Sequence, residues 1–277
     1  MKGLLIDVTR CIGCWECSNA CAKANSLPPV DSLTRATGAD LSADRFTVLR
    51  KVELGDRGRR YVRRMCMHCL EPTCASVCPV GALHRTPQGP VVYEVDRCIG
   101  CRYCIMACPH NVPRYEWDEA APRVRKCVLC APRVARGEPT ACAAACPMAA
   151  TVFGDRKELL AEARRRMVES PDLYEGGVFG EWEAGGTGVL FLSDVPFGSI
   201  GFPSNLPDHP LGANTEAVLS HLPDVLLIGG SLLFGLQWII HRRDKLAEEA
   251  EAVVAEGAAA KEDAAGRPLV TNGGGGK

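Results

Sequence analysis

The chain has 277 residues, a formal net charge of −1 and 16 cysteines. A charge so close to zero gives no support to a nucleic-acid-binding protein. Few aromatic residues stand beside 28 glycines and 19 prolines, which favours a loop-rich fold over one large packed core. Residues 1–150 hold 21 Lys and Arg against 14 Asp and Glu, and this local positive excess would suit bound anionic groups.

All the cysteines lie in four motifs in the first part of the chain. The first motif is CIGCWECSNAC, and the third repeats its spacing at a constant offset of 87 residues. The second and fourth share an EPT tripeptide and the ending C-x-x-x-C-P. The order A–B–A′–B′ indicates a duplicated two-motif unit, with these members in chain order: Cys11, Cys14, Cys17 and Cys21; Cys66, Cys69, Cys74 and Cys78; Cys98, Cys101, Cys104 and Cys108; Cys127, Cys130, Cys142 and Cys146.

The segments between and after the motifs carry ordinary secondary-structure signals. Residues 46–53 and 60–64 alternate in polarity around a turn at residues 55–58 and predict a hairpin. The stretch GALHRTPQGPVVYEVD, residues 81–96, predicts a second hairpin. Residues 155–170, DRKELLAEARRRMVES, have a helical period with a polar face, which predicts a surface helix packed on the cysteine-rich region.

An apolar segment, residues 218–241, lies near the end of the chain. Its charge-free part, from Val225 to Ile240, would make about 24 Å of helix, against about 30 Å of hydrocarbon in a bilayer. We expect a single transmembrane helix because the segment follows a complete domain and a basic run ending at Lys245 comes directly after it. A buried core helix is the alternative. Residues 242–277 predict a polar tail that is helical at first and otherwise largely disordered.

Three chemistries compete for the cysteines. Disulfides suit an even count, but a C-x-x-C pair closes too short a loop to constrain much, and this is not a small secreted scaffold. Structural zinc takes four ligands, often as two separated C-x-x-C pairs, which the second and fourth motifs could supply. The first and third motifs, with three thiols in seven residues, fit zinc poorly.

Iron–sulfur clusters fit all four motifs. In a [4Fe–4S] cube each iron needs a thiolate, and a C-x-x-C-x-x-C loop can wrap three corners. The fourth cysteine, usually followed by proline, reaches a different cube. Pro79, Pro109 and Pro147 follow the last cysteine of three motifs, whereas Ala22 departs from this pattern in the first. The 16 cysteines therefore predict four [4Fe–4S] clusters.

These motifs, in this order, resemble those of the iron–sulfur (beta) subunits of membrane-bound molybdopterin oxidoreductases and uptake hydrogenases. The stretch FGEWEAGGTGVLFLSDVPF, residues 179–197, is also similar to beta subunits of respiratory formate dehydrogenase and of a hydrogenase with a four-cluster ferredoxin subunit. The resemblance implies an α+β fold with two pseudo-symmetric ferredoxin-like halves, each with two [4Fe–4S] clusters, inserted hairpins and one C-terminal transmembrane helix. We expect the cluster domain at 1–155, a partner-facing extension at 156–217, the helix at 218–241 and the tail at 242–277.

The resemblance also implies that the ligands are exchanged between motifs. Each cluster would take three cysteines from one motif and its fourth from another. The implied sets are set 1, Cys11, Cys14, Cys17 and Cys146; set 2, Cys127, Cys130, Cys142 and Cys21; set 3, Cys66, Cys69, Cys74 and Cys108; and set 4, Cys98, Cys101, Cys104 and Cys78.

The function implied is electron transfer. The four clusters would relay electrons between a large catalytic subunit, of the molybdopterin formate dehydrogenase or NiFe hydrogenase type, and a membrane subunit that is a b-type cytochrome or quinone-linked. A quinol-linked molybdopterin reductase, with electrons flowing the other way, is one alternative. A membrane-anchored zinc-binding structural module is another. The sequence has no nucleophile elbow, P-loop or zinc-protease motif, so we expect no catalytic residue in this chain.

The membrane side follows from the basic residues after the apolar segment. They predict a single-pass protein of the inner membrane with a cytoplasmic tail and an external, periplasmic cluster domain. No signal-like stretch precedes Cys11, so export would require a folded complex carried by a partner's signal; a cytoplasm-facing domain is the alternative. Near the cysteines, His68 and Lys126 either tune a cluster or are plain surface groups.

Overall fold

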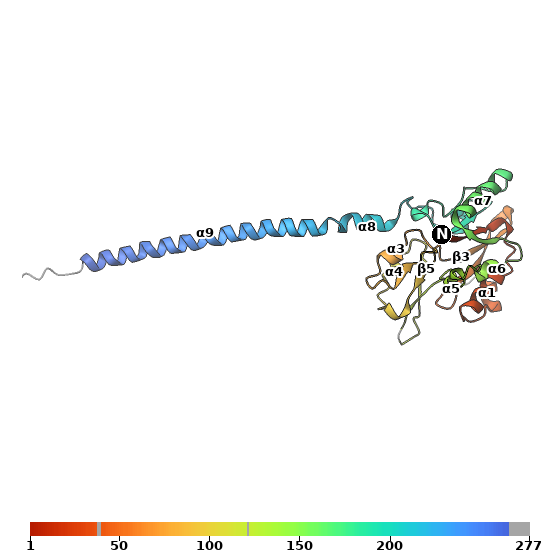
Figure 1. The fold of residues 1–277 in the computed structure, drawn as a ribbon, viewed down its shortest axis with the longest axis horizontal. Helices are drawn as coiled ribbons and strands as arrows, with labels where there is room; N and C mark the ends of the chain where they lie inside the picture. Colours follow the sequence, from red (N-terminus) through yellow and green to blue (C-terminus); the bar gives the residue numbers. More distant parts are fainter. Residues whose placement is uncertain (38–39, 121, 266–277) are drawn as a thin grey trace, which may run out of the picture. The chain divides into compact units, whose positions relative to one another are not determined.

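The computed structural model describes residues 1–37, 40–120 and 122–265. The chain divides into two compact units, residues 1–215 and 216–277. In the first unit, helices and strands are mixed along the chain (Figure 1), which agrees with the predicted α+β class.

A three-stranded sheet forms the centre of the first unit. Its order is β8–β1–β9, with β1 (Lys2–Asp7) antiparallel to β8 (Thr151–Asp155) and parallel to β9 (Val189–Leu192). All residues of β1 from Gly3 to Asp7 are buried, as expected for a strand covered on both faces. The first cysteine motif begins a few residues after this central strand, at Cys11.

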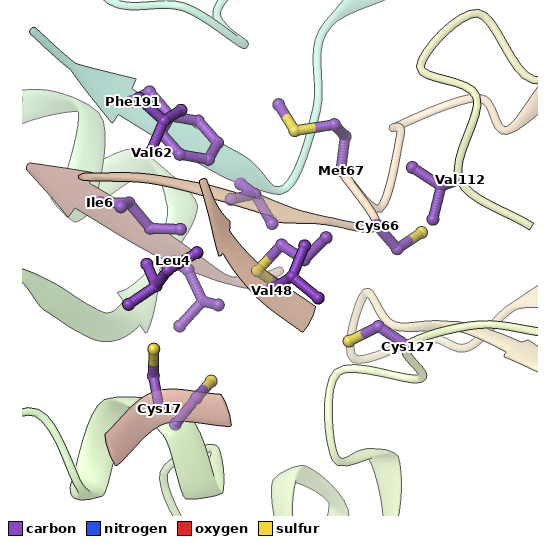
Figure 2. Packing of buried hydrophobic residues seen from close by; sticks show 14 of the residues in the cluster. Leu4, Ile6, Cys17, Val48, Val62, Cys66, Met67, Val112, Cys127 and Phe191 are labelled. Carbon is purple, nitrogen blue, oxygen red and sulfur yellow. The ribbon is translucent and has the colours of Figure 1, made fainter. Parts of the chain in front are cut away.

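The two faces of this sheet pack against different elements. On one face, Leu5 and Leu190 contact Leu159 and Ala163 of α7 (Arg156–Glu169), so the surface helix predicted at residues 155–170 is confirmed. The other face contributes to a core that contains apolar residues of the first hairpin and several cysteines (Figure 2): Leu4, Ile6, Phe191, Val48, Val62, Cys17, Cys66 and Cys127. The cysteine sulfurs are thus part of the hydrophobic core.

Three hairpins complete the first unit; the first packs in this core, whereas Leu83 of the second and Val124 of the third pack in a separate cluster with Cys104. The first joins β2 (Thr47–Glu53) to β3 (Arg59–Met65) through a tight turn, η2 (Gly55–Arg57). The second joins β4 (Leu83–Arg85) to β5 (Val91–Tyr93), so both predicted hairpins are confirmed. A third, shorter pair consists of β6 (Arg114–Tyr115) and β7 (Val124–Arg125), and β3 and β7 each end just before a cysteine motif.

Short helices accompany the cysteine motifs. Helix α1 (Glu16–Ala24) packs against α6 (Ala141–Ala144), and α3 (Thr73–Ser76) packs against α4 (Tyr103–Ala107). Figure 1 shows these two pairs in different parts of the first unit. Each pair therefore combines motifs that are distant in the sequence. The remaining short elements are α2 (Ser32–Thr37), α5 (Ala131–Ala135), and the 3-10 turns η1 (Val8–Arg10), η3 (Val95–Arg97), η4 (Glu183–Gly185) and η5 (Phe197–Ile200).

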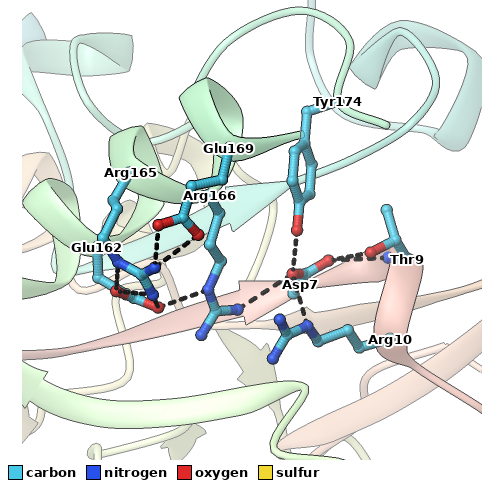
Figure 3. Close-up of polar contacts among 8 residues, drawn as sticks. All are labelled: Asp7, Thr9, Arg10, Glu162, Arg165, Arg166, Glu169 and Tyr174. Atoms are coloured by element: carbon cyan, nitrogen blue, oxygen red, sulfur yellow. Dashed lines mark hydrogen bonds and ion pairs between the residues drawn. The ribbon is translucent and has the colours of Figure 1, made fainter. Parts of the chain in front are cut away.

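A buried carboxylate fixes the end of β1 against α7. Asp7 is fully buried and accepts hydrogen bonds from the Thr9 backbone, the Thr9 hydroxyl, Tyr174 and Arg166 (Figure 3). Arg166 also pairs with Glu162 one helical turn away. The buried charge of Asp7 is therefore paired and hydrogen-bonded, as burial requires.

The C-terminal region is helical. Helix α8 (Leu211–Leu219) precedes α9 (Leu222–Ala265), and by length and composition the helical stretch from Leu211 to Gly257 contains a window apolar enough to cross a membrane, with a mean hydropathy of 1.6. Its apolar side chains, such as Leu232 and Phe234, are exposed, unlike those of a buried core helix. The helix also runs into the predicted tail as far as Ala265, because alanine, glutamate and lysine are strong helix formers. Residues 266–277 of the tail lie outside the described residues.

Candidate metal centres

The cysteine loops share a recurring backbone geometry. In the first and third motifs, Gly13 and Gly100 have φ of 72° and 70°, and Trp15 and Arg102 have φ of 66° and 63°. An added Cβ on Gly13 would fall 2.5 Å from the Tyr61 ring, so only glycine fits there. Because positive φ recurs at the same step of each loop, the two loops curl in the same way around their cysteines.

The second and fourth motifs have a matching signature. His68 and Leu129, each two residues after the first cysteine of its motif, have φ of 49° and 51°. The Leu129 backbone N–H donates to the Cys127 Sγ at 3.4 Å, as Gly100 donates to Cys98 at the same distance. Such N–H donors favour the thiolate form that binds metal.

The backbone after the last cysteine of a motif differs according to whether a proline follows that cysteine. In the three motifs with a C-P ending, the third residue after the last cysteine has positive φ, at 62°, 49° and 48° for Gly81, Asn111 and Ala149. Where Ala22 replaces the proline, α1 instead continues to Ala24. The missing proline is explained by this helix, since an internal proline would break it.

The set 1 cysteines line one cavity. Cys11, Cys14, Cys17 and Cys146 surround an empty space of about 430 Å³, together with Ile6, Leu49 and Arg63. Burial, in spite of a backbone hydrogen bond from Gly13, raises the pKa of Cys11 to about 11. The charges of Cys17, Cys146 and Cys14 raise it further, which places the three other thiols of this set near Cys11.

The set 4 cysteines line a second cavity. Cys78, Cys98, Cys101 and Cys104 surround an empty space of about 310 Å³. Burial and the charges of the three other cysteines raise the pKa of Cys104 to about 11. Cys101 of this set is exposed, whereas no cysteine of set 1 is.

The cysteines within set 2, and those within set 3, also lie near one another. Burial, followed by the charges of Cys142 and Cys130, raises the pKa of Cys21 to about 12. Burial raises the pKa of Cys69 well above its usual range, and the charges of Cys66, Cys108 and Cys74 add to this effect. Most thiols whose charges act on these two cysteines belong to the same implied sets, although Cys17 of set 1 also acts on Cys21, and protons must leave when a metal binds.

Some cysteines of different sets lie near one another. The charge of Cys142 of set 2 acts on Cys17 of set 1, and that of Cys66 of set 3 acts on Cys127 of set 2. The charge of Cys104 of set 4 acts on Cys74 of set 3. Set 1 therefore neighbours set 2, set 2 neighbours set 3, and set 3 neighbours set 4.

The donor set and its spacing distinguish the possible cofactors. All 16 cysteines are free thiols, which disagrees with a disulfide framework. Within the ranges 1–37, 40–120 and 122–265, no three Cys, His, Asp or Glu side chains converge as closely as a single metal ion requires. Four thiols around a cavity instead suit a cluster, whose corners hold the sulfurs apart.

Comparisons with known proteins point the same way. Residues 10–82 and residues 59–156 match two family models, each described as a 4Fe-4S dicluster domain. A protein of Nitratidesulfovibrio vulgaris is 40% identical over 273 residues, covering 95% of this chain and 73% of the relative. The hydrogenase-2 operon protein HybA of Escherichia coli O157:H7 is 33% identical over 279 residues, which cover 88% of this chain and 85% of HybA. The nitrate-inducible formate dehydrogenase iron-sulfur subunit of Escherichia coli K12 is 39% identical over 199 residues, covering 68% and 66%.

The chain belongs to the family of respiratory oxidoreductase iron–sulfur subunits. As a member of this family it carries two dicluster domains that bind [4Fe–4S] clusters. The predicted resemblance is confirmed, and the cysteines belong to iron–sulfur chemistry rather than to structural zinc.

Two groups that the sequence left open are buried in this iron–sulfur subunit. His68 has no exposed surface, and its Nδ1 accepts a hydrogen bond from the Val91 N–H at 3.0 Å, so it is not a surface residue. Burial and the charge of Lys126 hold the pKa of His68 well below its usual range, which keeps it neutral. Lys126 is itself 3% exposed and is no ordinary solvated cation.

Arg63 did not stand out in the sequence. It is 3% exposed and lies beside cysteines of two sets. Burial alone would raise the pKa of Cys142, but the charge of Arg63 lowers it below its usual value. The alternation of inward and outward side chains along β3 could have indicated that one arginine is buried. Four arginines in RRYVRRM made it unclear which one.

Proposed function

We propose that this chain is the electron-transfer subunit of a membrane-bound oxidoreductase. It relays electrons through four [4Fe–4S] clusters between a catalytic subunit and a cytochrome b or quinone-linked membrane subunit. The catalytic partner is of the formate dehydrogenase or hydrogenase type, since relatives of both kinds are similar to this chain. The two halves of the cluster domain are a pseudo-symmetric duplication.

One observation supports this proposal: the cysteine motifs are brought together in pairs, with each group of thiols next to another. Helix α1 packs against α6, and α3 against α4, which would let sets 1 and 2, and sets 3 and 4, exchange a cysteine. We propose these four sets as the cluster ligands. Electron transfer weakens steeply with distance, so a row of neighbouring sites is what a relay needs.

The chain's own residues bind, space and insulate the clusters. The cysteinates hold each cluster, which supplies the one-electron redox chemistry when bound. Burial of Cys66, Cys127 and Cys142 in the core excludes water from the middle of the row. Backbone N–H groups of residues such as Gly100 and Leu129 donate hydrogen bonds to cysteine sulfurs. These bonds stabilise the more negatively charged, reduced state of a bound cluster.

The apolar part of the C-terminal helix anchors the complex to the membrane. We propose one span over residues 218–241, with the cluster domain on the external side and the basic run after Ile240 on the cytoplasmic side. The exposed apolar surface of α9 supports insertion into lipid or against a membrane partner.

Metal analysis of the full-length protein tests the proposal. Anaerobically purified in mild detergent, the chain should contain about 16 iron atoms and as many sulfides, and the reduced protein should give [4Fe–4S] electron paramagnetic resonance (EPR) signals. A colourless protein with zinc and no iron would overturn it. In the complex extracted from native membranes, molybdenum or tungsten would indicate a formate dehydrogenase type partner, and nickel a hydrogenase.

A further inference from the structure

Four charged side chains are buried in the described part of the chain. Asp7 and Arg166 form an ion pair with each other at 3.1 Å. The other two, Arg63 and Lys126, have no carboxylate partner among residues 1–37, 40–120 and 122–265. Burying an unpaired charge is costly, so each cation requires an anionic neighbour of another kind.

Arg63 lies between the cysteines of sets 1 and 2. Its Nε donates to the Thr47 hydroxyl at 2.8 Å and its Nη1 to the Thr151 hydroxyl at 3.3 Å, which fixes the guanidinium in place. It lines the cavity of set 1, and it lies close enough to Cys142 and Cys21 of set 2 and to Cys17 of set 1 for their charges to act on it. Two hydroxyls orient this cation without neutralising it.

Lys126 lies at set 3. Its Nζ is 4.0 Å from the Cys66 Sγ and donates to the carbonyls of Val91 and Cys127, the latter at 3.0 Å. Its charge also acts on Cys74 and Cys108 of the same set. Like Arg63, it is held by neutral acceptors and directed at cysteine sulfurs.

We propose that Arg63 and Lys126 are the built-in counter-cations of the relay. Arg63 is shared by the clusters of sets 1 and 2, and Lys126 serves the cluster of set 3. Both residues are positioning residues that raise the midpoint potentials of these three clusters. The inference rests on the ligand sets of the proposed function.

The physical reason is charge balance. Four cysteinates outweigh the positive charge of an iron–sulfide core, so a bound cluster is anionic and gains one further negative charge on reduction. A fixed cation in a dry site stabilises the reduced form more than the oxidised one. One electron arrives from the partner subunit, no bond forms or breaks, and Arg63 keeps its proton throughout.

Set 4 supplies an internal control. The charged residue that lines its cavity, Arg102, is exposed to solvent rather than buried, and Cys101 there is exposed too. Removal of either buried cation should leave the potential of this cluster unchanged.

Redox titration of the full-length holoprotein followed by EPR tests the proposal. Signals are assigned with one Cys→Ser variant per set, at Cys14, Cys130, Cys69 and Cys101. Arg63→Gln, which keeps a donor but loses the charge, should lower the potentials of clusters 1 and 2 together. Lys126→Gln should lower cluster 3 most. Neither variant should shift cluster 4, and Arg63→Lys and Lys126→Arg should restore the shifted potentials.

Other outcomes are decisive too. Unchanged potentials, or equal shifts in all four clusters, would overturn the inference. If the Gln variants lose clusters, the charge-conserving Lys and Arg variants must retain them, and loss in these as well would overturn it. A wild-type protein without iron would contradict the proposed function. Four clusters whose potentials do not shift as predicted, clusters 1 and 2 with Arg63→Gln and cluster 3 with Lys126→Gln, would contradict only the role of the two cations.

Discussion

Among the sixteen cysteines, Cys21 has the most distinctive setting. It lies inside α1 rather than at a C-P ending, and the charges of Cys142 and Cys130 of the fourth motif act on it, as does that of Cys17. We predict that Cys21→Ser disturbs the cluster held by Cys127, Cys130 and Cys142 and leaves that of Cys11 largely intact. EPR of the reduced variant checks this.

The matched control is Lys23→Ala, which changes an exposed residue of the same helix and should leave all four signals unaltered. Loss of the Cys11 cluster, with the Cys127 cluster retained, would refute the exchanged ligand sets.

Asp7, four residues before Cys11, shows how one buried carboxylate can support the start of the first cysteine motif. Asp7→Asn removes the buried charge that pairs with Arg166 and should lower the free energy of unfolding by about 2 kcal/mol, because Arg166 then keeps only its pair with the part-exposed Glu162. Anaerobic urea titration followed by tryptophan fluorescence measures this. Glu169→Gln, which breaks only the exposed pair with Arg165, should cost less than about 1 kcal/mol. Equal effects would show that the network in Figure 3 contributes no burial-dependent stability.

At the scale of elements, local signals were predictable and long-range pairings were not. The hairpin of β2 and β3 and helix α7 follow from side-chain period and turn residues, which neighbouring residues determine. The parallel pairing of Leu5 with Leu190 joins distant segments, and no local pattern specifies it. Likewise the cysteine spacing predicted cluster ligands, but burial of Arg63 among four arginines of β3 depends on tertiary packing.

Helix α9 makes a testable element by itself. Leu232 is exposed in the middle of the apolar segment, and Leu232→Arg should reduce membrane association about 100-fold, since a central arginine costs about 3 kcal/mol in a bilayer. Flotation of the full chain with liposomes measures the change. Val254→Arg, on the polar part of the same helix, should have little effect. Equal binding by both variants would argue against a span at 218–241.

At the scale of the whole molecule, the proposed ligand sets would make the clusters cross-links as well as redox centres. Each proposed set would join motifs far apart in the sequence, as Cys146 with Cys11, and five cysteines belong to the main core: Cys17, Cys21, Cys66, Cys127 and Cys142. Closing such long loops costs chain entropy that cluster binding offsets, so metal binding and folding are coupled.

Iron removal should therefore unfold the first unit selectively. After oxidation and chelation, hydrogen exchange should rise in β2, β3 and the short cysteine helices, because the core loses its bound clusters and retains buried thiols in their place. In detergent, α9 has no cysteine and should keep its protection, which makes it the control within the same sample. If the first unit stayed protected without iron, the hydrophobic core alone would hold it, and the clusters would contribute conduction but not stability.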